Sequence, residues 1–124
     1  VRAVLEGVAQ AGADLVESAE ADGDFTIDVL RVDGGMTANP TFVQAVADAT
    51  RRPVEVSPVR EATALGAAYL AGLAVDTWAD AEEIRALWSP GERYEPIGTF
   101  DRDRWQDAVS RASGWHADLS ALDF

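Results

Sequence analysis

The chain has 124 residues, of which 22 are acidic, ten are basic and 48% are hydrophobic, so it carries a formal charge of −12 and should fold as one globular domain or part of one. This charge disfavours binding to nucleic acid or to an anionic membrane surface. All ten basic residues are arginine and cysteine is absent, which excludes a P-loop lysine, thiol catalysis and disulfide bonds and fits a cytoplasmic protein.

A helix with one buried apolar stripe is predicted over the first fifteen residues, because apolar side chains recur there at steps of three and four. The stripe consists of Val1, Val4, Leu5, Val8, Ala11 and Leu15. The chain begins inside this pattern without a capping residue, and we expect it to be a fragment of a longer protein. A polar connection over residues 21–24 is expected to follow.

Residues 25–32 are rich in β-branched and large apolar side chains, which predicts a β-strand. Val29, Leu30 and Val32 place apolar groups on both faces near the end of this strand, as in a strand that is covered on two sides. The sequence Asp-Gly-Gly at residues 33–35 is expected to end it.

The glycine pair Gly34 and Gly35 is followed by Asn39, a favoured helix N-cap, and by Pro40, which suits the first helical position. Two glycines allow a ligand to approach the main chain closely. Free N–H groups and the positive end of the helix dipole then lie beside the turn, where an anion or a nucleotide is expected to bind. A purely structural turn is the alternative.

The next segments predict a βαβ unit. Helical spacing continues from Pro40 to Thr50, Arg51-Arg52-Pro53 ends the helix, and Val54-Glu55-Val56 has the composition of a short strand. A strand, a helix and a second strand in about thirty residues require parallel strands and a right-handed crossover. The sequence therefore predicts an α/β fold, mostly helical, with a small parallel sheet.

Residues 61–75 are small or apolar almost throughout, but they are too few to span a membrane, so we expect a buried helix. A shorter helix is expected within residues 76–88, with Thr77 or Asp80 as its cap.

The last part of the chain is expected to be extended over residues 93–96 and then to form a helix capped by Asp101. The stripe of this helix is Trp105, Ala108, Val109, Ala112 and Trp115. The last residues are expected to fray, with docking of Leu119, Leu122 and Phe124 on the core as the alternative. His116 is the single histidine and is expected at the surface, so a cluster of histidine metal ligands is excluded.

Two acidic residues suggest other chemistry. Glu55 follows the glycine pair by about twenty residues, where a Rossmann dinucleotide site has a ribose-binding acid. The first glycine after Gly35 is Gly66, however, so the G-x-G-x-x-G spacing is absent. Asp33 suits magnesium coordination or proton transfer at the end of a strand, and it equally suits a turn.

Two motifs resemble the C-terminal part of the FGGY family of carbohydrate kinases, and within that family the glycerol kinases. The first is Leu-Arg-Val-Asp-Gly-Gly-Met-Thr-Ala-Asn-Pro-Thr-Phe-Val-Gln at residues 30–44, followed by Asp48. The second is Arg-Glu-Ala-Thr-Ala-Leu-Gly-Ala-Ala-Tyr-Leu-Ala-Gly-Leu-Ala at residues 60–74. The resemblance implies part of an actin-like (ribonuclease H-like) ATPase domain, with residues 1–124 as its C-terminal segment.

The same resemblance implies the ligands and the site. Gly35 and Asn39 match the family positions that contact the adenine nucleotide, and Gly34 and Met36 form the wall beside them. The cofactors implied are ATP and Mg²⁺, and the phosphate acceptor is glycerol, which becomes glycerol 3-phosphate. The family's catalytic-base aspartate, polyol-binding residues and phosphate-gripping loops come from earlier segments that nothing here resembles. We therefore expect no catalytic or metal-binding residue in this chain, which alone should be inactive.

Two alternatives stay open at this point. The first is another FGGY sugar or polyol kinase, such as a xylulokinase-like enzyme, because the substrate contacts lie outside these residues. The second is a non-catalytic acidic interaction module on the same scaffold. For the complete enzyme we expect a homo-oligomer, and for the isolated chain we expect self-association through uncovered apolar surface.

Overall fold

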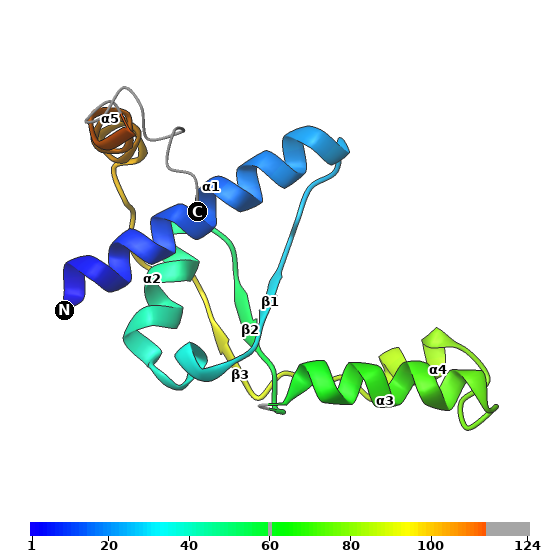
Figure 1. Ribbon diagram of the computed structural model, residues 1–124. Coiled ribbons are helices and arrows are strands. Elements are labelled where there is room, and N and C mark those ends of the chain that lie inside the picture. Colours follow the sequence, from blue (N-terminus) through cyan, green and yellow to red (C-terminus); the bar gives the residue numbers. More distant parts are fainter. Residues whose placement is uncertain (60, 114–124) are drawn as a thin grey trace, which may run out of the picture.

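The computed structural model describes residues 1–59 and 61–113 (Figure 1). In chain order the elements are α1 (Arg2–Gly23), β1 (Leu30–Val32), the 3-10 helix η1 (Gly35–Ala38), α2 (Pro40–Thr50), β2 (Val54–Val56), α3 (Ala62–Ala74), α4 (Ala81–Ala86), β3 (Glu92–Tyr94) and α5 (Arg102–Ser113). Helices predominate, as predicted. The expectations for Trp115, His116, Leu119, Leu122 and Phe124 lie outside the described residues.

The strands form one sheet with the order β1-β2-β3. β2 pairs in parallel with β1, where Leu30 lies opposite Val54, and antiparallel with β3, where Val54 lies opposite Tyr94. Since α2 connects β1 to β2, the predicted βαβ unit is confirmed. The sheet is mixed rather than wholly parallel, because the segment expected only to be extended forms β3 and takes the second edge of β2.

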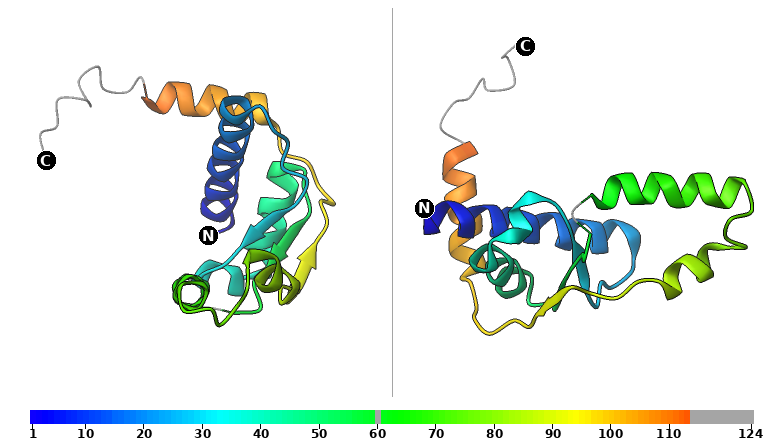
Figure 2. Two further views of the ribbon diagram at one scale, coloured as in Figure 1. Left: turned by 90° about the vertical axis from the view of Figure 1, so that its right-hand side faces the viewer. Right: turned by 90° about the horizontal axis from the view of Figure 1, so that it is seen from below.

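α2 lies between α1 and the sheet, so both parts of the core meet on it (Figure 1, Figure 2). The cluster on the α1 side contains Ala9, Ala13, Ala45 and Ala49, and the cluster on the sheet side contains Val43, Ala47 and Val54. Full burial of a valine side chain stabilises a fold by about 1.5–3 kcal/mol. Val43 and Val54, the largest fully buried side chains, therefore hold α2 on the sheet.

The buried side of α1 differs from the prediction. Four residues of the predicted stripe are 45% or more exposed, namely Val1, Val4, Val8 and Leu15. The contact with α2 is made instead by Ala9 and Ala13, because small side chains let two helices approach closely. α1 also continues to Gly23, through most of the expected polar connection, and ends at Asp24 in the left-handed conformation.

The predicted strand over residues 25–32 is wrong in length, because only Leu30–Val32 is a strand. The backbone before it is held by side chains instead of by a strand ladder. The Ile27 N–H donates to Glu20 Oε1 (2.7 Å), and the Ile27 carbonyl accepts from Arg52 Nε (2.8 Å). Arg52 also pairs with Glu20 at 2.6 Å, so this segment is fixed between the end of α1 and the start of β2.

The face of the sheet away from α2 carries a ladder of charged side chains. Glu55 on β2 lies opposite Arg31 on β1 and Arg93 on β3, and it pairs with them at 3.3 Å and 2.8 Å. The guanidinium of Arg31 stacks on Trp88, 4.8 Å from the ring centre. The expectation that β1 is covered by apolar groups on both sides is therefore wrong. On the outer face of the sheet, basic and acidic side chains alternate from β1 to β2 to β3.

The predicted helix over residues 61–75 exists as α3, but in this chain it is not buried. It projects away from the sheet in Figure 1 and in the right view of Figure 2. Leu70 and Val75 are 70% and 72% exposed, and Gly72 is the buried residue of the helix. Trp78 packs there, with its ring edge to face against Tyr69 at 5.2 Å. No helix in residues 1–59 or 61–113 combines the length and the apolar character needed to cross a membrane.

Two of the predicted caps are confirmed in the second half of the chain. Asp80, rather than Thr77, caps α4, because its Oδ1 accepts from the N–H groups of Glu82 and Glu83 at 2.9 Å and 3.0 Å. Asp101 Oδ1 accepts from the N–H of Arg104 at 2.9 Å and caps α5.

Asp48 ties the segment before α5 to α2. Its Oδ1 accepts from the N–H groups of Ile97 and Gly98 at 2.8 Å and 2.9 Å, and from Gln44 Nε2 at 3.0 Å. Gln44 Nε2 also donates to the Glu95 carbonyl at 2.9 Å. The carboxylate of Asp48 and the carboxamide of Gln44 therefore provide hydrogen-bond partners for backbone groups that belong to no β-strand or helix.

Asp14 on α1 anchors α5. Its carboxylate accepts from Trp105 Nε1 and Gln106 Nε2, both at 2.7 Å, and forms an ion pair with Arg102. Arg102 Nη1 also donates to the Gln10 carbonyl at 3.0 Å. Burial alone would raise the pKa of Asp14, but hydrogen bonds from Trp105 and Arg102 outweigh it, and the pKa is lowered.

Acid is expected to release α5 from α1. Because the folded pKa of Asp14 lies below the unfolded one, its stabilising contribution is complete at neutral pH and is lost as the pH falls through the folded pKa, below about pH 4. Asp14→Asn should release α5 already at neutral pH. A change in the NMR chemical shift of the Trp105 indole N–H would report this release. Glu17→Gln is the control, because Glu17 contacts Arg102 at 3.2 Å but not Trp105. A Trp105 indole resonance unchanged down to about pH 2 would contradict the role of Asp14.

Candidate functional site

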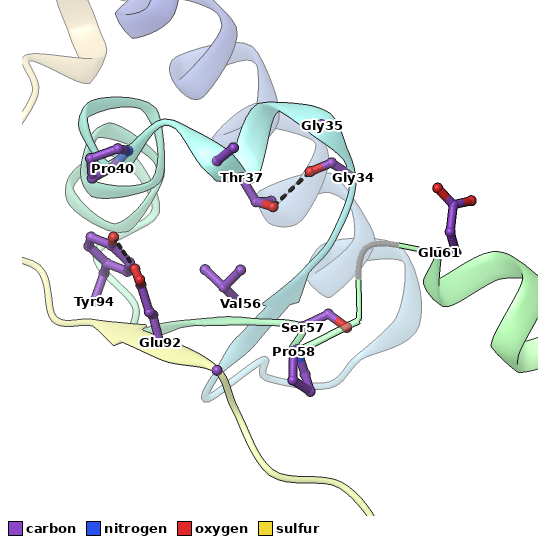
Figure 3. Close-up of a pocket in the computed structure, with 12 residues that line it drawn as sticks. Gly34, Gly35, Thr37, Pro40, Val56, Ser57, Pro58, Glu61, Glu92 and Tyr94 are labelled. Atoms are coloured by element: carbon purple, nitrogen blue, oxygen red, sulfur yellow. Dashed lines mark hydrogen bonds between the residues drawn. The ribbon is translucent and has the colours of Figure 1, made fainter.

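A pocket of about 550 Å³ opens at the carboxyl ends of β1 and β2, beside η1 and the start of α2 (Figure 3). Ligands of α/β proteins bind preferentially at this edge of a parallel strand pair. The lining residues come from the glycine turn, from β2 and the segment after it, and from β3: Gly34, Gly35, Thr37, Ala38, Pro40, Val56, Ser57, Pro58, Glu61, Gly91, Glu92 and Tyr94.

The glycine turn forms one wall of this pocket. Gly34 has φ 95° and ψ 177°, a conformation that is essentially restricted to glycine. Its carbonyl oxygen accepts two hydrogen bonds from Thr37, at 3.1 Å from the N–H and at 2.7 Å from the hydroxyl. The turn continues into η1 rather than directly into α2, a detail that the sequence did not indicate.

Asn39 and Met36 do not line the pocket, although both belong to the same segment. Asn39 is the predicted N-cap of α2: its Oδ1 accepts from the N–H groups of Thr41 and Phe42 at 3.1 Å and 3.4 Å. Met36 is 47% exposed outside the pocket. Of the four predicted nucleotide-binding residues, the pocket therefore brings together Gly34 and Gly35, while Asn39 and Met36 lie beside it.

Two carboxylates that the sequence analysis did not select also line the pocket, from different sides (Figure 3). Glu61 precedes α3, and Glu92 on β3 accepts a hydrogen bond from the Tyr94 hydroxyl at 2.5 Å. This hydrogen bond and partial burial raise the pKa of Tyr94. Glu92 reaches the pocket only because β3 pairs with β2, where it lies opposite Val56, and no local pattern signals that pairing.

The structure does not support the two rival sites. Glu55 is engaged by arginines on the far face of the sheet. Burial would raise its pKa, but hydrogen bonds from Arg93 and Arg31 outweigh this and lower it. A ribose-binding role is thereby excluded. Asp33 lines a separate hollow with Arg31 and Trp88, and no cluster of three metal-ligating side chains forms within the described part of the chain.

Residues 1–75 match the model of the FGGY family of carbohydrate kinases, C-terminal domain. The chain belongs to this family. It is 50% identical over 120 residues to glycerol kinase 2 of Thermotoga maritima, covering 93% of the chain and 24% of that protein. It is 48% identical over 119 residues to the glycerol kinase of Thermococcus kodakarensis, covering 92% of the chain and 24% of that protein.

Two solved structures share the fold. A crystal structure of Plasmodium falciparum glycerol kinase with ADP matches with a TM-score of 0.69 and 34% identity, over 99% of this chain and 24% of that one. Xylulose kinase from Rhodospirillum rubrum matches with a TM-score of 0.71 at 24% identity, over 90% and 23% of the two chains. The predicted actin-like architecture is thus confirmed, and the chain spans about a quarter of the length of the relatives it matches.

Proposed function

We propose that residues 1–124 form the C-terminal, nucleotide-binding segment of a glycerol kinase-like enzyme that transfers the γ-phosphate of ATP to glycerol and produces glycerol 3-phosphate. The observation that carries this proposal is the glycine turn, which forms one wall of a pocket in a chain that is 45–50% identical to segments of glycerol kinases. The enzyme is proposed to act in the cytoplasm as a homo-oligomer.

The charge of the pocket favours one end of the nucleotide. Glu61 and Glu92 repel phosphate groups, whereas carboxylates accept hydrogen bonds from ribose hydroxyls and from an amino group. Among residues 1–59 and 61–113, none that lines the pocket is basic. The pocket therefore suits the uncharged nucleoside, while the phosphates with Mg²⁺ face outward from the turn, toward groups that this chain does not supply.

The chemistry of the reaction depends on those other groups. Phosphoryl transfer requires a base that accepts the proton of the attacking hydroxyl, together with charge neutralisation around the γ-phosphate. The contribution of this chain is to hold the nucleotide in place, and the isolated chain is expected to have no kinase activity.

A titration followed by amide NMR tests the proposal. Adding magnesium ADP or adenosine should shift the amide resonances of Gly34, Gly35, Met36 and Asn39, and guanosine should have a smaller effect. If neither ligand shifts these resonances in the chain or in the complete kinase, the turn is only structural and the proposal fails.

Asn39 variants separate contact with the nucleotide from helix capping. Asn39→Ala removes both and should also cost about 1 kcal/mol of stability. Asn39→Asp keeps the oxygen that caps α2 but loses the amide donor, so it should weaken nucleotide binding without loss of stability. Equal ADP affinity in wild type and Asn39→Asp would exclude a role for the amide group.

A kinase for another sugar or polyol is the weaker candidate. The likeness to a xylulose kinase is below 25% identity and supports the fold alone, whereas the glycerol kinases of Thermotoga maritima and Thermococcus kodakarensis are 48–50% identical. No observation favours an acidic interaction module.

A further inference from the structure

Glu92 is a charged residue on the apolar face of the sheet. Side chains of a strand alternate between the two faces, so Glu92 lies on the same face as Tyr94, while Arg93 lies on the charged face with Glu55. The other positions on the face of Glu92 carry side chains that belong to the core or pack against it: Leu30, Val32, Val54, Val56 and Tyr94. Packing therefore does not account for a carboxylate at this position, which lines the pocket instead.

The Tyr94 hydroxyl holds the Glu92 carboxylate at the pocket. It donates to Glu92 Oε2 at 2.5 Å, and its ring is anchored because it packs against the core (Figure 3). The hydrogen bond to Glu92 and burial raise the pKa of Tyr94, so the hydroxyl keeps its proton at neutral pH. Because that proton is directed to Glu92, the lone pairs that remain on both groups accept hydrogen bonds and have none to donate. The pair therefore suits a ligand that presents hydrogen-bond donors.

Two adjacent hydroxyl groups match these acceptors. A carboxylate has two oxygens that accept from both hydroxyls of a vicinal diol, and hydrogen bonds to a charged acceptor are stronger than neutral ones. The ribose of a nucleoside carries such a diol at its 2′ and 3′ positions, whereas phosphate groups are anionic and are repelled by Glu92. Pro40, Val56 and Pro58 give the same pocket apolar walls for the flat faces of a base.

We propose that Glu92, oriented by Tyr94, recognises the sugar of the nucleotide, with its carboxylate accepting hydrogen bonds from the 2′- and 3′-hydroxyls of ribose. Glu92 contacts the ligand, and Tyr94 acts through it as a positioning residue. This inference rests on the proposed nucleotide-binding function and adds to it a preference for ribose over 2′-deoxyribose, which is set by β3 rather than by the glycine turn.

The test measures the dissociation constants of adenosine and 2′-deoxyadenosine by amide NMR on the chain, and those of the corresponding diphosphates on the complete kinase. In the wild type, loss of the 2′-hydroxyl should weaken binding about tenfold, the effect of one hydrogen bond to a charged group. Glu92→Gln should weaken adenosine binding until the two dissociation constants agree within about twofold. Tyr94→Phe keeps the ring in the core but frees the carboxylate, and it should reduce the preference to about threefold.

Glu95→Gln is the matched control. Glu95 is a carboxylate close to Glu92 in sequence, but it pairs with Arg93 at 2.7 Å and does not line the pocket. This variant should keep the full preference for adenosine over 2′-deoxyadenosine. Glu61→Gln removes the same charge from another side of the pocket (Figure 3). If Glu61→Gln abolishes the preference and Glu92→Gln does not, the sugar does not lie at β3 and the inference is wrong.

Three further outcomes contradict the inference. Equal affinity of the wild type for adenosine and 2′-deoxyadenosine overturns it while leaving nucleotide binding intact. An equal loss of affinity for both ligands in Glu92→Gln shows a role in the shape or charge of the pocket and not in sugar recognition. If Glu92→Gln changes the ratio of adenosine to inosine affinity instead, the carboxylate contacts the base. If the wild type binds neither adenosine nor ADP, in the chain or in the complete kinase, the proposed function fails, and the role of Glu92 fails with it.

Discussion

Gly34→Ala is expected to destabilise the folded chain by about 1–3 kcal/mol and to abolish binding of ADP. The reason is conformational, because Gly34 adopts φ 95° and ψ 177°, which a residue with a Cβ reaches only under strain. The alanine would force the peptide after it to rotate and would break both hydrogen bonds from Thr37. Urea unfolding measures the first effect and an ADP titration measures the second.

Gly35→Ala is the matched control for this prediction. Gly35 does not have a positive φ, and a Cβ there meets no other atom within 4 Å, so stability should change by less than about 0.5 kcal/mol. The added methyl group would nevertheless obstruct the proposed approach of the nucleotide to the turn, and ADP affinity should fall at least about tenfold. If both variants lose the same stability, the special conformation of Gly34 is not what the turn requires.

Gly72→Ala is expected to detach Trp78 from α3. A Cβ on Gly72 would lie 2.0 Å from Trp78 Cζ3 and 2.3 Å from Cε3, far inside contact distance. The indole must move, and overpacking of this kind costs about 1–3 kcal/mol. Faster amide hydrogen exchange along α3 and a shifted Trp78 indole resonance would report the change.

Gly66→Ala on the same helix should have the opposite effect. Nothing lies within 4 Å of a Cβ at this position, and replacing a glycine inside a helix with alanine stabilises it by about 0.5–1 kcal/mol. Amide hydrogen exchange along α3 should therefore become slower. If Gly72→Ala also slowed exchange, the packing of Trp78 would not be what holds this part of the chain.

The segment from the glycine turn to β2 was predictable from the sequence, because its signals are local. Asn39 and Pro40 specify where α2 begins, and both act within one turn of the helix. The short strand Val54–Val56 follows a proline and consists mainly of β-branched residues. The same local signal predicted Gly34 as a turn residue, and its positive φ confirms this.

The wrong predictions concern features that depend on packing against residues far away in the sequence. Apolar periodicity located α1 correctly but not its buried side, which is set by the alanines of α2. The apolar composition of α3 predicted burial, yet within the described residues its main partner is Trp78. Glu92 entered the site through the pairing of β3 with β2, a contact between residues 36 positions apart at Val56 and Glu92.

The contact between Asp48 and Gly98 constrains how the two positions can change in evolution. The carboxylate needs the N–H of residue 98, and a Cβ on that residue would lie 2.8 Å from Asp48 Oδ2. A side chain at position 98 is therefore tolerated only if residue 48 shortens or turns away, which leaves two backbone N–H groups to be satisfied by something else. The two positions, 50 residues apart in sequence, are expected to be retained or replaced together in related chains.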